Sequence, residues 1–116
     1  MQQSKIFIDV HLDADKVPNK INWSATDSTI EEMQAAKAMM LSFWDGADKS
    51  ALRIDLWTKE MMVDEMADFY YQHLISLADT FKRATGQAEL GESLKTFAAD
   101  FYKKFRESQE QENKLS

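Results

Sequence analysis

The chain has 116 residues, of which 44% are hydrophobic and 29% are charged. These values match an ordinary globular domain and exclude a collagen-like, low-complexity or wholly disordered protein. The formal net charge of −6 makes nucleic acid and anionic membrane surfaces poor partners, because both are bound mainly through Lys and Arg. The lack of cysteine excludes disulfides, thiolate nucleophiles and cysteine-bound metals.

The first elements in the chain predict a β-hairpin. Residues 5–13 alternate apolar and polar side chains, the period of two expected of a strand with one buried face. The apolar members are Ile6, Ile8, Val10 and Leu12. Pro18 and Asn19 then suit a turn, because proline fixes φ and asparagine tolerates unusual backbone angles. A short second strand follows over residues 20–24.

The segment after this hairpin is compatible with a helix or a strand. Residues 26–32 carry a helix-start signature in which Ser28 and Glu31 would form a capping box. Residues 33–43 keep helical spacing, yet the end of the same run also alternates as a strand does. We favour a strand over residues 36–44, because a turn signal comes directly after it.

That turn signal leads into a clearer strand. Asp45 and Gly46 form the turn, and residues 51–57 then alternate strictly. One side of this predicted strand carries Leu52, Ile54 and Leu56, and the other carries Arg53, Asp55 and Trp57. The pattern indicates one apolar face and one mixed face.

Two amphipathic helices are predicted in the C-terminal half. After Met62 the apolar period changes to that of a helix, with Asp64 as the predicted N-cap and Gly86 as a left-handed stop. The first apolar stripe consists of Met66, Tyr70, Leu74, Leu77, Phe81 and Ala84. The second consists of Leu90, Leu94, Phe97, Phe101 and Phe105. Residues 107–116 are almost entirely polar, so we expect a disordered tail there.

These elements predict a single α+β domain over residues 1–106. Strands precede helices, an order that favours α+β over a βαβ sheet. We expect an antiparallel sheet of about four strands in meander order, with the two C-terminal helices packed on its apolar face. This arrangement would bury most of the Phe and Met side chains, each worth roughly 1.5–3 kcal/mol when fully buried.

One face of the first predicted strand carries ionisable residues. Asp9, His11 and Asp13 share that face, and a histidine between carboxylates is chemically able to bind a divalent metal or act as a general base. Neighbours on one strand face lie about 7 Å apart, so at most two could reach one ion. A solvated polar face is the simpler interpretation, and we predict no catalytic site, metal or cofactor. A hydrolase using Asp9 and His11 is the least favoured hypothesis.

The mixed side of the sheet is more informative. If the apolar strand residues face the helices, then Phe7, Arg53 and Trp57 must point the other way, together with Asp55 and Trp44. Exposed tryptophan and arginine are enriched where proteins bind partners, so we interpret these five residues as candidate partner contacts. A dimer seam, a loop folded over this face and ordinary cross-strand packing are the alternatives.

Several short runs in the sequence belong together. The most specific is Leu52-Arg53-Ile54-Asp55-Leu56-Trp57-Thr58-Lys59, which places a tryptophan at a strand end just before a helix. The others are Trp23-Ser24-Ala25-Thr26-Asp27, Phe43-Trp44-Asp45, Met62-Val63-Asp64-Glu65-Met66 and Ala84-Thr85-Gly86. Together they resemble the gliding motility-associated GldC family of Bacteroidota over residues 5–86.

The resemblance implies a small accessory protein that supports gliding over surfaces, a process tied to cell-envelope machinery that overlaps with protein secretion. It brings no catalytic motif, so a protein partner from that machinery or a second copy of the chain is expected. A small-molecule-binding domain with a pocket lined by Met and aromatic residues is the alternative. The sequence has neither a signal-like N-terminal block nor an apolar run of the ~18 residues a membrane helix needs, so we expect a cytoplasmic location without direct membrane insertion.

Overall fold

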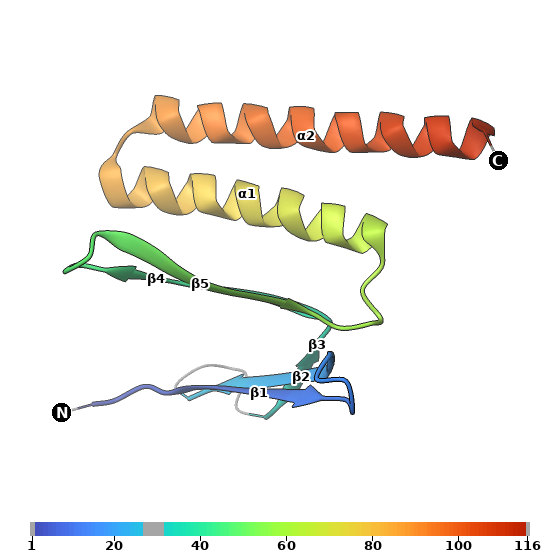
Figure 1. Ribbon diagram of the computed structural model, residues 1–116. Helices are drawn as coiled ribbons and strands as arrows, with labels where there is room; N and C mark the ends of the chain where they lie inside the picture. The colour runs from blue at the N-terminus through green and yellow to red at the C-terminus, as the bar shows by residue number, and fades with distance from the viewer. Residues whose placement is uncertain (1, 27–31, 116) are drawn as a thin grey trace. The chain divides into compact units, whose positions relative to one another are not determined.

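The computed structural model describes residues 2–26 and 32–115, and within them five strands precede two helices (Figure 1). The elements are β1 Ile6–Leu12, β2 Pro18–Ala25, β3 Gln34–Ala36, β4 Ala38–Asp45, β5 Ser50–Trp57, α1 Val63–Thr85 and α2 Ala88–Leu115. This composition confirms the predicted α+β class. The chain divides into two compact units, Met1–Met61 with the strands and Met62–Ser116 with the helices.

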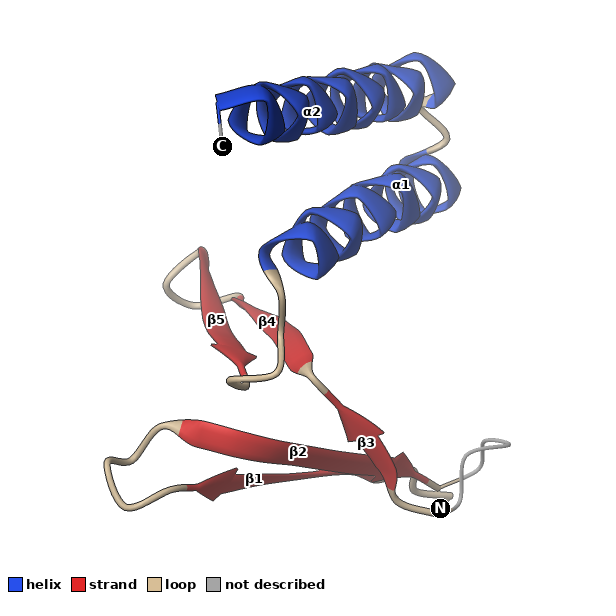
Figure 2. Cartoon of the chain, turned by 90° about the vertical axis from the view of Figure 1, so that its right-hand side faces the viewer, coloured by secondary structure: helices blue, strands red, loops and turns tan. Residues whose placement is uncertain are grey.

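The strands form two antiparallel sheets, one of β1, β2 and β3 and one of β4 and β5, where we predicted one sheet of about four strands (Figure 2). The meander order is kept, but the third predicted strand is divided at Lys37. Before this residue Ala36 pairs with Ile21 of β2, and after it Ala38 pairs with Trp57 of β5. β3 pairs with β2 and β4 pairs with β5, so neither strand connects the two sheets. The chain bends at Lys37, and the sheet does not continue across this residue.

A buried threonine stabilises this division. The Lys37 carbonyl accepts hydrogen bonds from the Thr58 amide at 2.8 Å and from the Thr58 hydroxyl at 2.9 Å. Thr58 is buried, and these bonds satisfy its polar groups. The strand predicted over residues 36–44 is confirmed by β4. The capping box predicted at Ser28 and Glu31 lies outside the described residues.

Both hairpin turns are built on an aspartate. The Asp13 Oδ1 accepts the Val17 amide at 3.0 Å in the turn between β1 and β2. The Asp45 Oδ1 accepts the Ala47 amide at 2.9 Å in the turn between β4 and β5, where the sequence predicts one. An aspartate that caps nearby amides in this way holds a turn in one conformation.

The strand unit has its best-buried side chain on β2. Ile21 is 1% exposed and pairs with Val10 on one side and Ala36 on the other. β2 is the middle strand of its sheet, so its residues have neighbours on both edges. The side chains of the edge strands are more open, and Ile6 and Leu12 of β1 are largely exposed.

The two helices form an antiparallel hairpin with a glycine in the turn between them. Gly86 has a φ of 73°, and its amide donates to the Lys82 carbonyl at 2.8 Å, which confirms the predicted stop. The start differs from the prediction by two residues. Met62 is the N-cap, and its amide donates to the Glu65 carboxylate at 3.1 Å, while Asp64 lies in the first turn. Acidic side chains there complement the positive helix end.

The seam between the helices consists of small residues. Ala67, Ala78 and Ala98 are buried there, and Gly91 lies so close to α1 that an added Cβ would stand 3.3 Å from the Ala78 carbonyl oxygen. Close approach of two helices requires such side chains. An ion pair also bridges the seam, with the Lys95 Nζ of α2 lying 2.9 Å from the Asp79 Oδ1 of α1.

The predicted apolar stripes therefore do not form the centre of this seam. Leu77, Leu90 and Phe97 are about half exposed, whereas Tyr70 and Phe101 stack across the hairpin with ring centroids 6.5 Å apart. The predicted packing of the stripes on the sheet, and the predicted single domain over residues 1–106, stay predictions.

The C-terminal segment is helical where we expected a disordered tail. α2 continues to Leu115, through most of the polar residues 107–116. Glu and Gln dominate this stretch, and both are good helix formers. Gln109 is also partly buried, which adds some packing to this intrinsic preference.

Candidate functional site: the mixed face of the β4–β5 hairpin

The register of β4 and β5 brings most of the predicted partner contacts together. Residues paired across antiparallel strands share a face, and so do alternate residues along each strand. We call the resulting surface the mixed face. It consists of Ala38, Met40, Ser42 and Trp44 from β4 and Ala51, Arg53, Asp55 and Trp57 from β5. The opposite face of this sheet is apolar, with Met39, Leu41, Phe43, Leu52, Ile54 and Leu56.

Two exposed indole rings lie at opposite ends of the mixed face. Trp44 is 69% exposed and is paired with Ala51 beside the hairpin turn. Trp57 is 58% exposed and is paired with Ala38 at the other end. Large rings left in solvent on a small domain are uncommon and often mark binding surfaces.

An ion pair occupies the β5 side between the rings. The Arg53 Nη2 lies 2.9 Å from the Asp55 Oδ1, and its Nε lies 3.2 Å from the Oδ2. Two parallel bonds hold the guanidinium and the carboxylate in one orientation. Both side chains are more than 40% exposed, so the pair adds little to folding stability.

Phe7 does not belong to the mixed face. It lies on β1, paired with Ser24 of β2, in the three-stranded sheet. Its side chain is 48% exposed. The sequence placed Phe7 with the other four candidates because a single continuous sheet was expected, and the break at Lys37 removes that continuity.

Asp13, one of the three ionisable residues predicted to share a face, has a structural role in the turn after β1. The carboxylate of Asp13 accepts the Val17 amide and forms an ion pair with Lys59 at 2.5 Å. The hydrogen bond from Lys59 is the main reason that the pKa of Asp13 is held below its usual value. Asp13 therefore fastens the first hairpin turn to the segment after β5.

Asp9 and His11 remain on one face of β1, opposite Asn22 and Lys20 of β2. The register shifts between His11 and Leu12, which interrupts the alternation that was to place Asp13 beside them. Over residues 2–26 and 32–115, no three His, Cys, Asp or Glu side chains gather into a group able to hold a metal ion.

A groove of about 210 Å³ adjoins Trp57. Its lining consists of Val17 from the first hairpin turn and Pro18 from the start of β2, together with Asp55, Leu56 and Trp57 from β5. The groove offers apolar walls and one carboxylate to a side chain that docks beside the indole ring. Sequence reasoning missed Val17 and Pro18, because no local pattern brings residue 18 next to residue 57.

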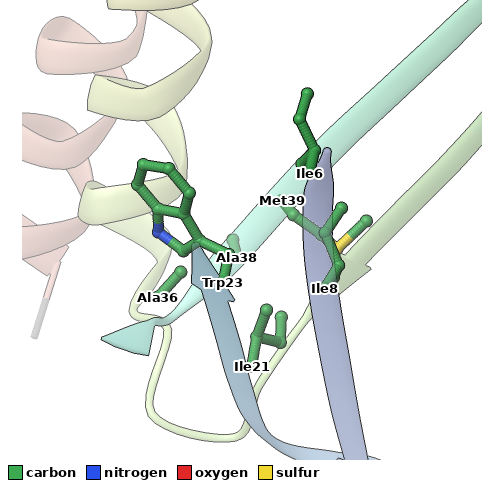
Figure 3. A pocket seen from close by; sticks show the side chains of 7 residues that line it. All are labelled: Ile6, Ile8, Ile21, Trp23, Ala36, Ala38 and Met39. Atoms are coloured by element: carbon green, nitrogen blue, oxygen red, sulfur yellow. The ribbon is translucent and has the colours of Figure 1, made fainter. Parts of the chain in front are cut away.

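A second cavity, of about 190 Å³, opens between the two sheets of the strand unit (Figure 3). Figure 3 shows its lining, which comprises Ile6, Ile8, Ile21, Trp23, Ala36, Ala38 and Met39. A cavity of this size holds an object about as large as a benzene ring. One methionine and one tryptophan contribute, but no charged side chain does, so nothing in the lining would select a polar ligand.

Comparison with known proteins gives a family. Among the residues that the structure describes, no helix has the length and apolar character to cross a lipid bilayer. A family model described as "Gliding motility-associated protein GldC-like" matches residues 18–107, which include the whole mixed face. No curated protein and no solved structure gives a significant match. The chain therefore belongs to the GldC-like family of gliding motility-associated proteins.

Proposed function

We propose that this chain is a non-enzymatic accessory protein of bacterial gliding motility that works in the cytoplasm by binding a protein of the cell-envelope motility and secretion machinery. The family supports the link to motility. The observation that carries the binding mechanism is the pair of exposed rings, Trp44 and Trp57, on one face of the β4–β5 hairpin.

The chemistry of the mixed face suits protein recognition. Tryptophan supplies a large, rigid apolar area and an indole N–H donor, which is why it is enriched among the residues that dominate binding energy. The groove beside Trp57 gives a partner side chain a place to insert next to that ring. The two tryptophans therefore act as anchors in the proposed complex.

The ion pair of Arg53 and Asp55 supplies polar groups between the two tryptophan anchors. Arg53 and Asp55 neutralise each other, so a partner that covers them does not bury an isolated charge. The fixed orientation of the pair favours a partner with complementary polar groups. In this proposal Phe7, on the other sheet, contributes at most a peripheral contact.

Affinity capture from a gliding bacterium tests this proposal. Immobilised wild-type chain is compared with Trp44→Ala, Trp57→Ala and Phe43→Ala. Phe43 is the matched control, because it precedes Trp44 on β4, is 59% exposed and points to the opposite face. All four proteins are first shown to have the same circular dichroism spectrum.

The proposal expects a motility or envelope component on the wild-type and Phe43→Ala baits and its depletion on both tryptophan variants. Truncation of an anchor typically costs 2 kcal/mol or more, which corresponds to about a thirtyfold loss of affinity. Equal capture by all baits would show that the mixed face is not the binding surface. Capture lost only with Phe43→Ala would place binding on the apolar face instead.

A further inference from the structure

β5 is an edge strand of its two-stranded sheet. Among the described strands, β4 is its sheet neighbour. The Thr58 amide bonds to the Lys37 carbonyl, and hydrogen-bonded pairs alternate along an antiparallel ladder. The backbone amides and carbonyls of residues 51, 53, 55 and 57 are therefore directed away from β4. An edge of this kind is a template for a further antiparallel strand.

The β5 sequence is complementary to itself when read in the opposite direction. With a two-fold axis at Ile54, this side chain meets Ile54 of a second copy, and Leu52 meets Leu56. Arg53 then lies opposite Asp55, and Ala51 lies opposite Trp57. Opposite charges and apolar pairs placed directly across strands stabilise antiparallel pairing.

The backbone phase selects the same register. Residues 53 and 55 both direct their backbone groups outward, so they meet as a hydrogen-bonded pair when Ile54 lies on the axis. A shift by one residue would oppose outward-directed groups with groups already bonded to β4. The two nearest shifts that keep the phase place Arg53 opposite Arg53 or Asp55 opposite Asp55. Of these registers, the one centred on Ile54 alone satisfies both the backbone and the charges.

We propose that two copies of this chain pair through β5 in antiparallel order, which joins two β4–β5 hairpins into one four-stranded sheet. Within each copy Arg53 already lies 2.9 Å from Asp55. The second copy would place an opposite charge across the strand from each of them. The four charges then alternate in sign around the axis, while the half-exposed Leu52 and Ile54 gain cross-strand partners on the apolar side.

The dimer has a defined relation to the mixed face. A two-fold axis perpendicular to a sheet keeps equivalent faces on the same side, so both mixed faces point in one direction. The dimer thus presents two sets of Trp44 and Trp57 to a common partner. Self-pairing uses the edge of β5 and does not depend on the proposed function, and it is measured on the pure protein without any partner.

Charge variants test the register. Arg53→Asp and Asp55→Arg each replace two opposite-charge pairs across the axis with two like-charge pairs. Wild type is expected to dimerise at micromolar concentration, and each variant about tenfold or more weakly. Sedimentation velocity over a concentration series gives the dissociation constants. Thermal unfolding of each variant checks that it is folded.

Mixing the two variants gives the sharper result. Arg53→Asp carries two acidic residues at these positions and Asp55→Arg carries two basic ones, so the heterodimer regains both opposite-charge pairs. Neither variant regains its own internal ion pair on mixing, so repair of the fold does not explain a recovery of dimer formation. Both variants keep a net negative charge, so general electrostatic attraction does not explain it either. Native mass spectrometry is expected to show heterodimer in excess of either homodimer.

A backbone variant provides an independent check. Ala51→Pro removes an amide that is directed away from β4, so the β4–β5 ladder is retained while a bond to the second copy is lost. Ala51→Ser is its matched control. Dimer lost with proline and kept with serine is the expected result. Monomeric wild type at every concentration, a dimer unaffected by Ala51→Pro, or no heterodimer on mixing would each overturn the proposal.

Discussion

Gly91 provides the most direct test of how the helical hairpin is held together. An added Cβ would stand 3.3 Å from the Ala78 carbonyl oxygen and 3.3 Å from the Lys82 Cβ, which is tighter than most Cβ contacts. The oxygen belongs to the backbone of α1, so it moves only if the helices separate. The intrinsic helix propensity of alanine exceeds that of glycine by about 1 kcal/mol. We therefore expect Gly91→Ala to leave the free energy of unfolding nearly unchanged, because the two effects offset each other.

A larger side chain at the same position separates these effects. Gly91→Val adds an isopropyl group to the seam, and overpacking of this kind costs about 1–3 kcal/mol. Ser93→Val is the matched control, because Ser93 is exposed on the same helix and reports the helix propensity of valine alone. Urea unfolding followed by helical circular dichroism gives both free energies. If Gly91→Val were no less stable than Ser93→Val, the close contact at the seam would be refuted.

Three further predictions concern single positions. Gly86→Ala is expected to destabilise the hairpin by about 1 kcal/mol, because φ there is 73°, whereas Gly46→Ala is expected to be neutral; equal unfolding midpoints would contradict this. The hydrogen bond from Lys95 lowers the pKa of Asp79, so the pair stabilises the fold above the ordinary carboxyl pKa and loses this effect as pH falls through the lowered value. Lys95→Met should raise that pKa in an NMR titration, and an unchanged pKa would exclude the pair. Asp13→Ala removes the acceptor of two turn amides and should lower the unfolding midpoint in urea; an unchanged midpoint would show that the turn does not need this carboxylate.

The elements that sequence reasoning predicted correctly have local causes. Strict alternation at residues 51–57 places Arg53, Asp55 and Trp57 on one face, and the register of β5 confirms that placement. Gly86 is a helix stop because its own backbone requires a positive φ. Patterns of this kind depend on neighbouring residues and are therefore visible in a single sequence.

The features that sequence reasoning missed depend on contacts between distant residues. The division of the sheet follows from hydrogen bonds between Lys37 and Thr58, which are 21 residues apart. The groove beside Trp57 needs Pro18 from another hairpin. No periodicity encodes such contacts, and the same limitation placed Phe7 on the mixed face.

The helix seam shows a different limit. Hydrophobic periodicity finds the stripe with the largest apolar side chains, but Leu77 and Phe97 from these stripes are about half exposed. The helices meet instead along Ala78 and Ala98, where small side chains allow close approach. Counting apolar residues does not distinguish a seam of small residues from an exposed stripe of large ones.

If the mixed face binds the motility machinery, as we propose, gliding itself must depend on its two tryptophans. The most direct measurement replaces the native gene of a gliding bacterium with wild type, Trp44→Ala/Trp57→Ala or Phe43→Ala, and records the speed of single cells at equal protein level. We expect normal gliding with Phe43→Ala and impaired gliding with the double tryptophan variant. Normal gliding with the double variant would contradict it.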